Sequence, residues 1–528
     1  MSTTTKISNY KKIVNFEHSL RGDFENLNYN PTFKSSAIFF VITNKYINTK
    51  ISFLNYWKIK NANIDISCQF TIRKQNGEKI LRKFFKISNN TYKISLGSLL
   101  KENLKISNFI GSIELELHSS YDLKYSFPAI DAIYETKEGI SLVHSNQRVY
   151  DNLDDIKLNE SLNQTQTGFD IHLDSKNETF ITAINGPVNL YKKKLNIVFY
   201  NLQGHKLKES IQFENIKPYQ TIYLELKNFK KLKKFLKNKR GFCKIDLPTQ
   251  NIFNRILVGT ISNDKKNITT THSYYDCSNT KDFIKTSNIS KEEYHCYLPF
   301  NLIKNVDLEI VIYPIFSRTN LKIALEEFNK NGKRKIINKN LININKNFKE
   351  PKIIEVSSAI LKAKNKAVDY NNVFCLNITS EDNLIPSRFT FGFNYKQRSI
   401  GSNISESMIV NHGKNIKGRG FYWGPVFCSK KIKTLIALSS VNKLKNNSES
   451  KSNLVKMNIY GSEKIILTKK FNIKSPQGFN LDLDKLINSK YKKKDEIFWF
   501  TLETQEKNIL CKHVHLSKFG HVCADHAF

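Results

Sequence analysis

The chain has 528 residues, of which 40% are hydrophobic and 12% aromatic; this excludes an intrinsically disordered protein and favours several domains over one. Lys and Arg total 83 against 47 Asp and Glu, which gives a formal net charge of +36. This excess fits either a coding sequence rich in A and T, which favours Lys, or attraction to a polyanion such as nucleic acid, an anionic polysaccharide or a membrane surface.

The first 30 residues form a polar extension without the continuous apolar stretch of a signal peptide. The longest apolar runs, such as AIFFVI at residues 37–42, are much shorter than the roughly 20 residues that span a bilayer. We therefore expect a cytoplasmic protein without a transmembrane segment, and export by another route stays open.

Glycine turns at a regular interval are the first sign of a repeat. Each glycine stands in a polar turn between two strand-like runs, as in FNKNGKRK at residues 328–335, and this pattern is typical of β-hairpins. Consecutive turn glycines are 127, 128 and 129 residues apart. They are Gly77, Gly204, Gly332 and Gly461.

Two further landmarks follow each glycine in the same order. An alternating strand runs into a short stretch rich in Leu and Lys, and a second alternating strand then ends at a polar turn, where Asp and Asn are favoured. The turn residues are Asp122, Asn251, Asn383 and Asn508. A histidine closes each copy, and these histidines are His144, His272, His412 and His526.

This order predicts a mainly β protein made of four tandem β-sandwich modules of about 128 residues with short helices. A period of this length is a whole domain rather than a solenoid repeat of about 20–50 residues. The modules resemble immunoglobulin-like sandwiches in pattern only, which says little about function. The expected boundaries are 1–30 for the N-terminal extension and 31–150, 165–278, 290–415 and 418–528 for the four modules.

Eight cysteines are present, and none has a CxxC spacing. Three of them, Cys68, Cys243 and Cys375, lie inside strand-like runs. We expect these three to be buried, unpaired thiols in a reducing compartment rather than parts of a disulfide framework.

The densest basic stretch is KNFKKLKKFLKNKR, residues 227–240. Its apolar residues fall at helical spacing and its lysines crowd the other face, which predicts an amphipathic basic helix that binds a polyanion. The alternative is a solvated surface whose apolar stripe packs on its own module. The lysines expected to bind are Lys230, Lys233, Lys234 and Lys237.

Arginine is scarce, and two arginines occupy matching places. Arg255 and Arg388 each stand four residues before a glycine. A guanidinium group recognises carboxylate, sulfate or phosphate through its planar fork, so both are candidate binding residues. An ion pair within each module is the alternative.

Three consecutive aromatic residues open the fourth module. Phe421, Tyr422 and Trp423 stand beside glycines in GRGFYWGPVF, where they could form a platform for a sugar or a base. Packing in the core is the alternative.

The C-terminal run CKHVHLSKFGHVCADHAF holds candidate metal ligands. His513 and His515 would share one face of a strand, because strand side chains alternate, and His521 and His526 follow closely. Together they could close a zinc site, although their spacing matches no zinc pattern closely. A strand and tail rich in partly exposed histidine is the alternative.

The sequence contains no GxGxxG, P-loop, HExxH or GxSxG motif. We favour a non-enzymatic, multi-module binding or scaffold protein that recognises an anionic partner, with anionic polysaccharide slightly ahead of nucleic acid. The alternative is a metal-dependent hydrolase or transferase that acts on glycans, with its site in the C-terminal module. The sequence names no cofactor and leaves the oligomeric state open.

Overall fold

The computed structural model of the chain divides into two compact units, residues 1–276 and 277–528. Both are mainly β and consist of small antiparallel sheets, which confirms the predicted fold class at that level. Within the described residues, no helix has both the length and the apolar character that a bilayer crossing requires. The structure describes residues 31–144, 147–150, 165–275, 283–285, 296–329, 333–346, 350–364, 368–386, 389–398, 401–407, 409–410, 419–440, 452–474, 477–492, 496–505 and 509–528.

The first segment of the first unit, residues 31–150, contains two four-stranded sheets. Their strand orders are β1-β6-β3-β4 and β5-β2-β7-β8. Its elements are β1 (Lys34–Thr43), β2 (Asn48–Leu54), α2 (Tyr56–Asn61), β3 (Ser67–Lys74), β4 (Lys79–Lys86), β5 (Thr91–Ser95), α3 (Leu96–Leu104), β6 (Phe109–His118), β7 (Ile130–Glu135), β8 (Ile140–His144) and β9 (Arg148–Val149).

The second segment, residues 165–275, has the sheet orders β13-β12-β15-β10-β19 and β14-β11-β17-β18, and β9 of the first segment pairs with β16. Its elements are β10 (Gln166–Ile171), β11 (Asn177–Ile184), β12 (Leu190–Asn201), β13 (Lys206–Ile216), β14 (Thr221–Glu225), η2 (Leu226–Asn228), α4 (Leu232–Leu236), β15 (Gly241–Asp246), β16 (Ile252–Phe253), β17 (Leu257–Ser262), β18 (Ile268–His272) and β19 (Tyr274–Tyr275).

The third segment, residues 283–410, belongs to the second unit and has the sheet orders β24-β23-β26-β21-β30 and β25-β22-β28-β29, with a small β20-β27 pair. Its elements are β20 (Phe283–Lys285), β21 (Cys296–Phe300), β22 (Asp307–Ile312), β23 (Leu321–Phe328), β24 (Arg334–Ile344), β25 (Lys352–Glu355), α5 (Val356–Lys364), β26 (Val373–Ser380), β27 (Leu384–Pro386), β28 (Thr390–Lys396), β29 (Ser402–Ser407) and β30 (Ile409–Val410).

The fourth segment, residues 419–528, has the sheet orders β31-β36-β33-β34 and β35-β32-β37-β38. Its elements are β31 (Gly420–Phe427), β32 (Ile432–Ser440), β33 (Ser452–Tyr460), β34 (Ile465–Lys474), β35 (Gln477–Asp482), η3 (Leu483–Lys485), η4 (Ser489–Tyr491), β36 (Ile497–Thr504), β37 (Ile509–Ser517) and β38 (Val522–His526).

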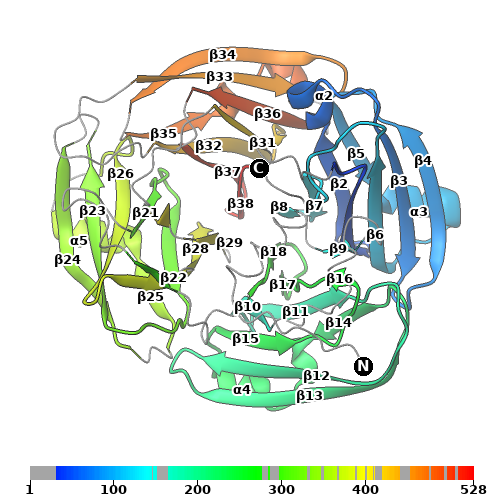
Figure 1. Cartoon of the computed structure of the whole chain (residues 1–528), viewed down its shortest axis with the longest axis horizontal. Coiled ribbons are helices and arrows are strands. Elements are labelled where there is room, and N and C mark those ends of the chain that lie inside the picture. Colours follow the sequence, from blue (N-terminus) through cyan, green and yellow to red (C-terminus); the bar gives the residue numbers. More distant parts are fainter. Residues whose placement is uncertain are drawn as a thin grey trace. The chain divides into compact units, whose positions relative to one another are not determined.

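One strand order recurs in all four segments. When the eight main strands of a segment are counted from its start, one sheet reads 1-6-3-4 and the other 5-2-7-8. Strands 3 and 4 form a hairpin, and strand 4 is always an edge strand; the β3–β4 hairpin (blue) and the β33–β34 hairpin (orange) are visible in Figure 1. These edge strands, β4, β13, β24 and β34, all carry exposed lysines.

The three turn glycines within the described residues lie in these hairpins, but not all in the same conformation. Gly77 and Gly204 have left-handed φ angles of 87° and 75°, and each donates its N–H to a carbonyl oxygen three residues earlier. Glycine is favoured there because it has no Cβ. Gly461 instead starts its turn, donates its N–H to the carbonyl oxygen of Lys464 at 2.9 Å and has no left-handed φ. Gly332 lies outside the described residues.

The later polar turns follow the expected chemistry where they are described. Asn251 and Asn383 adopt left-handed φ angles of 54° and 57°, which asparagine tolerates better than most residues. The carboxylate Oδ1 of Asp122 accepts the backbone N–H groups of Thr32 and Lys124, both at 2.9 Å. Asn508 lies outside the described residues.

In three segments, a threonine on strand 2 makes two hydrogen bonds back across the connecting turn to the end of strand 1. We call this pair of bonds the threonine fastening. The threonine hydroxyl accepts the backbone N–H and donates to the carbonyl oxygen of the residue seven positions earlier, at distances of 2.6–3.0 Å. The pairs are Thr49 with Ile42, Thr179 with His172, and Thr434 with Phe427. In the third segment, the stretch from the end of β21 through β22 contains no threonine.

In the second and fourth segments an apolar core lies between the two sheets. In the second segment, Ile197 and Cys243 from one sheet pack in one cluster with Ile181 and Val258 from the other. Such clusters use the inward face of each alternating strand. They hold the fold together mainly through burial of apolar surface.

The three strand cysteines behave as predicted. Cys68, Cys243 and Cys375 are buried and take part in no disulfide. Burial raises the pKa of Cys68 and of Cys243 to about 12 and also raises the pKa of Cys375, because the thiolate would have to be desolvated. These thiols are therefore protonated core residues.

Candidate functional site

The basic stretch at residues 227–240 follows β14 on the second segment. Leu226, Leu232 and Leu236 are buried in the core of that segment, with Phe229 and Phe235 packed against them. The lysines between and just after these anchors are exposed: Lys230, Lys231, Lys233, Lys234, Lys237 and Lys239. The apolar stripe therefore docks on its own segment and presents the lysines to solvent.

The helix in this stretch is shorter than the sequence pattern predicted. Only Leu232–Leu236 is α-helical, preceded by a single 3₁₀ turn, and Lys237 and Asn238 adopt left-handed φ angles of 52° and 57° that end the helix. Lysines three and four positions apart repel each other on a helix, which disfavours a longer one. The lysines are thus held by the leucine anchors rather than by a continuous helix.

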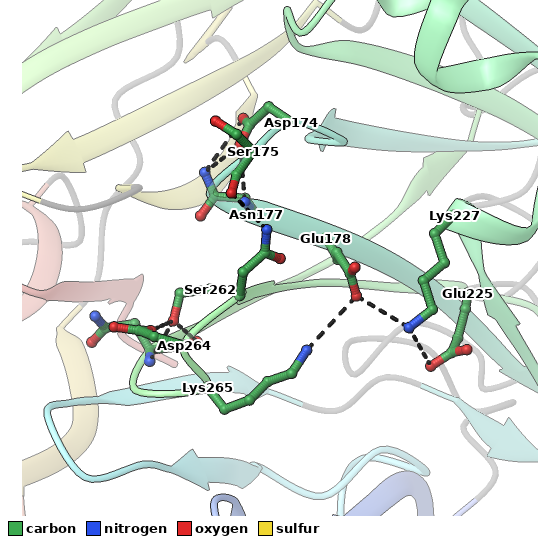
Figure 2. Close-up of polar contacts among 11 residues, drawn as sticks. Asp174, Ser175, Asn177, Glu178, Glu225, Lys227, Ser262, Asp264 and Lys265 are labelled. Carbon is green, nitrogen blue, oxygen red and sulfur yellow. Dashed lines mark hydrogen bonds and ion pairs between the residues drawn. The ribbon is translucent and has the colours of Figure 1, made fainter.

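The start of the stretch differs from the rest because its lysine is paired. Lys227 contacts Glu178 at 3.2 Å and Glu225 at 3.8 Å, and Glu178 also lies 3.7 Å from Lys265 (Figure 2). The hydrogen bond to Glu178, followed by the nearby carboxylate charges, raises the pKa of Lys227. No such carboxylate contacts Lys230, Lys233, Lys234 or Lys237 among the described residues.

The same end of the second segment holds a network of turn hydrogen bonds. Asp174 accepts the backbone N–H groups of Lys176 and Asn177 at 2.7 and 2.9 Å, and Ser262 donates to Asp264 at 2.6 Å (Figure 2). The bond from Ser262, with help from a backbone N–H, lowers the pKa of Asp264. These bonds close the turns that start at Asp174 and Ser262 and so fix the two loops.

Arg255 lies against a histidine and an aromatic ring. Its guanidinium Nη1 is 2.9 Å from Nδ1 of His272, and its guanidinium carbon is 5.4 Å from the centre of the Phe253 ring. His272 in turn meets His144, with 3.2 Å between their Nε2 atoms. Two of the predicted closing histidines of the first unit are therefore in contact. Arg388 and His412 lie outside the described residues.

The aromatic run on β31 packs against other rings. Trp423 is buried, stacks on Phe528 with ring centres 5.8 Å apart, and contacts Phe421 at 5.6 Å. Tyr422 points to the opposite face of the strand and packs on the core of the fourth segment, where burial raises its pKa to about 12. Trp423 and Tyr422 thus mainly serve packing, and Phe421 and Tyr422 are both half-buried.

His513 and His515 share one face of β37, as predicted, and are both buried. His513 Nδ1 lies 2.9 Å from His515 Nε2, and His515 Nδ1 lies 2.9 Å from Thr434 Oγ1. Thr434 already donates its single hydroxyl proton to the Phe427 carbonyl oxygen, so it must accept from His515. The direction of the two hydrogen bonds follows: His513 Nδ1–H donates to His515 Nε2, and His515 Nδ1–H donates to Thr434.

Burial fixes the charge state of the His515 side chain. Desolvation, and secondarily the neighbouring His513, lowers the pKa of His515 well below its ordinary value, while Asp525 opposes the shift. A neutral imidazole suits the donor and acceptor pattern, because each ring nitrogen of His515 is used once. His515 is therefore neutral at pH 7.

The other two predicted metal ligands do not join this pair. His521 is buried and accepts the Ser517 N–H through its backbone carbonyl oxygen, and His526 is half-buried with its Nε2 4.0 Å from Asp525. Among the described residues of the second unit, no three His, Cys, Asp or Glu ligand atoms gather within 4.8 Å of one another.

Two features escaped the sequence analysis. The threonine fastening left a regular signal, since Thr49 and Thr179 are 130 residues apart and Thr434 follows 255 residues later, about twice that interval. The contacts between Arg255, His272 and His144 join residues far apart in the sequence. His144 and His272 end strands of different sheets, which only tertiary packing brings together.

Comparison with known proteins adds no assignment. No model of a known protein family matches the chain. No curated protein is significantly similar to it in sequence. The residues themselves therefore carry the functional interpretation.

Proposed function

We propose that this chain is a non-enzymatic binding or scaffold protein that recognises an anionic polymer through the lysines of residues 230–239. The observation that carries the proposal is a set of exposed lysines that contact no carboxylate among the described residues, held in place by Leu226, Leu232 and Leu236 in the core. Anchored lysines lose less conformational freedom on binding than lysines on a mobile tail.

The packing of the aromatic rings favours an anionic polysaccharide over nucleic acid. Single-stranded nucleic acid is commonly held by base stacking on exposed aromatic rings, but Phe229 and Phe235 pack on the core. Phe229 stands edge-on to Phe199, with ring centres 5.4 Å apart. A duplex groove is usually filled by a longer helix or a β-ribbon, and α4 has five residues. Sulfate or carboxylate groups along a glycan need only the ammonium groups.

We further infer that the four segments are copies of one β-sandwich module, immunoglobulin-like in broad pattern. The recurring strand order and the threonine fastening in three segments support this inference. A chain of similar modules is a common architecture for proteins that bind rather than catalyse, and the functional part of this inference is by analogy.

The test is a charge reversal of the lysine cluster in the full chain. Changing Lys230, Lys233, Lys234 and Lys237 to Glu should weaken binding to heparin by about tenfold or more and leave thermal unfolding nearly unchanged, because single exposed charges contribute only about 0–1 kcal/mol to stability. The affinity of the wild type should fall steeply with salt, through counterion release.

A matched variant separates the site from the overall charge. Reversal of Lys335, Lys339, Lys470 and Lys474, which are exposed on edge strands of the second unit, changes the net charge equally. This variant should retain most of the heparin affinity. Equal losses in both variants, or an affinity independent of salt, would overturn the proposal.

A further inference from the structure

The last main strands of the first two segments lie beside each other in the first unit. Ser141 on β8 and Thr270 on β18 are joined by a 2.9 Å contact between hydroxyls, and the Thr270 N–H donates to Ser141 Oγ at 2.7 Å. The two residues are 129 positions apart. Ser141 stands three residues before the end of its strand, and Thr270 stands two residues before the end of its strand. Each strand ends in a histidine, His144 and His272, which are 128 positions apart.

The two imidazoles meet nitrogen to nitrogen. Their Nε2 atoms are 3.2 Å apart, with ring planes at 86°. Two imidazole nitrogens at about 2.0–2.1 Å from one tetrahedral zinc ion would be separated by about 3.3 Å. Two lone pairs at this distance repel each other, so the gap must hold either a shared proton or a cation.

The surroundings of His272 provide the support that a metal ligand needs. Its Nδ1 lies 3.0 Å from the carbonyl oxygen of Ser273, the next residue. If Nδ1–H donates to this oxygen, the lone pair of Nε2 points toward His144, as in most metal-bound histidines. His272 is buried and His144 is half-buried, so the ion could approach from the His144 side.

We propose that His144 and His272 bind one divalent transition-metal ion, zinc being the reference case, through their Nε2 atoms, with water or further donors completing the coordination. Neutral imidazole is a good ligand for zinc, copper, nickel and cobalt. This site is separate from the lysine surface and does not depend on the anionic partner.

Arg255 opposes the ion and sets its affinity. Its guanidinium Nη1 donates to His272 Nδ1 at 2.9 Å, and with this bond made His272 carries its proton on Nε2 and donates it to His144. Binding of a metal requires the other tautomer, in which Nδ1–H turns to the Ser273 carbonyl oxygen. Removal of the guanidinium should therefore tighten metal binding, the opposite of what a purely structural Arg255 contact would predict.

The experiment uses the full chain, stripped with a chelator and titrated with zinc(II) by calorimetry and with cobalt(II) by visible absorption. The wild type should bind one ion at this site, and zinc should raise the midpoint of thermal unfolding by mass action. H144Q and H272Q should each lose at least about tenfold in affinity, and R255Q should gain affinity severalfold.

Control variants test the location of the site. H205Q changes a histidine in the β12–β13 turn, and the double variant H513V/H515T removes the buried pair of the second unit; both should keep the wild-type affinity. If H272Q does not fold, H144Q at the half-buried position decides. Zinc binding that survives H144Q, that is lost in H513V/H515T, or that is missing from the wild type at millimolar zinc would overturn the proposal, and weaker binding in R255Q would contradict the role given to Arg255.

Discussion

In the second segment Thr179 meets Thr260 across neighbouring strands, and in the fourth segment Thr434 meets His515 at the same register of the same two strands. The two oxygens of the first pair are 2.7 Å apart, and Nδ1 of His515 is 2.9 Å from Thr434 Oγ1. The spacing along the chain is 81 residues in both. The side chain that hydrogen-bonds to the fastening threonine is thus a hydroxyl in the second segment and an imidazole in the fourth.

The difference extends to the next position on the strand. Two residues before Thr260 the second segment has the apolar Val258, whereas two residues before His515 the fourth has His513. The hydroxyl pair cannot gain a charge at any pH at which proteins fold, but the imidazole pair can. The same fastening therefore carries a dependence on pH in the fourth segment that it lacks in the second.

The largest expected effect comes from removing the threonine hydroxyls. Thr434→Val would leave the Phe427 N–H and carbonyl oxygen and the His515 Nδ1–H without their partner, at a cost of about 2–4 kcal/mol in the free energy of unfolding. Thr179→Val should cost less, because His172 is half-buried and water can replace part of the loss. Hydrogen exchange measured by mass spectrometry, peptide by peptide, separates the two segments.

Equal effects of Thr179→Val and Thr434→Val would contradict this prediction. If Thr179→Val destabilises its segment as much as Thr434→Val does, burial of the fastened residue does not matter. The comparison would then lose its physical basis.

The next effect is a difference in acid stability. His515 has a lowered pKa in the folded protein, so the unfolded chain binds more protons once the pH falls below the ordinary histidine value near 6.5. Stability is therefore complete above that pH and declines below it, by up to about 1.4 kcal/mol per pH unit for this group. Protection from hydrogen exchange should fall between pH 6.5 and 5 in β37 more than in β17.

Transplanting the residues of the second segment gives the matched control. The double variant H513V/H515T places valine and threonine where the second segment has Val258 and Thr260. It should remove most of the acid-dependent loss in β37. A slope that persists would assign the acid sensitivity to other groups, such as Asp525.

The smallest effect concerns the turn before the fastening. Asp174 in the second segment and Ser429 in the fourth each accept the backbone N–H groups two and three residues later. Asp174 accepts at 2.7 and 2.9 Å and Ser429 at 3.2 and 3.1 Å, and bonds to a carboxylate are the stronger kind. Asp174→Ala should cost about 1–2 kcal/mol and Ser429→Ala about 0.5–1, measured by denaturant unfolding.

Much of the fold could be predicted from local patterns. Turn glycines such as Gly77 and Gly204 and turn asparagines such as Asn251 reveal themselves because few residues tolerate left-handed φ angles. Buried Cys243 could be predicted because its strand alternates. The position of Gly461 within its turn could not be predicted, because its hairpin turn has a different geometry in which the glycine stands at the first position.

The candidate sites were harder to predict, for physical reasons. The helix predicted at residues 227–240 is longer than the observed one, because the spacing of apolar residues does not take account of repulsion between lysines. The sequence leaves both ligand contact and core packing open for Trp423, and Phe528, more than 100 residues away in sequence, stacks on it. The meeting of His144 and His272 depends on two strands that only tertiary packing brings together.

Lysines on the edge strands β4, β13, β24 and β34 can have a structural role that involves no binding partner. An edge strand exposes unpaired backbone groups that can pair with another chain, and lysine on such an edge discourages this. Side chains such as Phe84 and Ile336, exposed at 66% and 46%, would make bare edges adhesive. Two molecules that approach edge to edge bring ammonium groups together, so the positive charge protects against self-association. A polyanion that neutralises these groups would remove this protection.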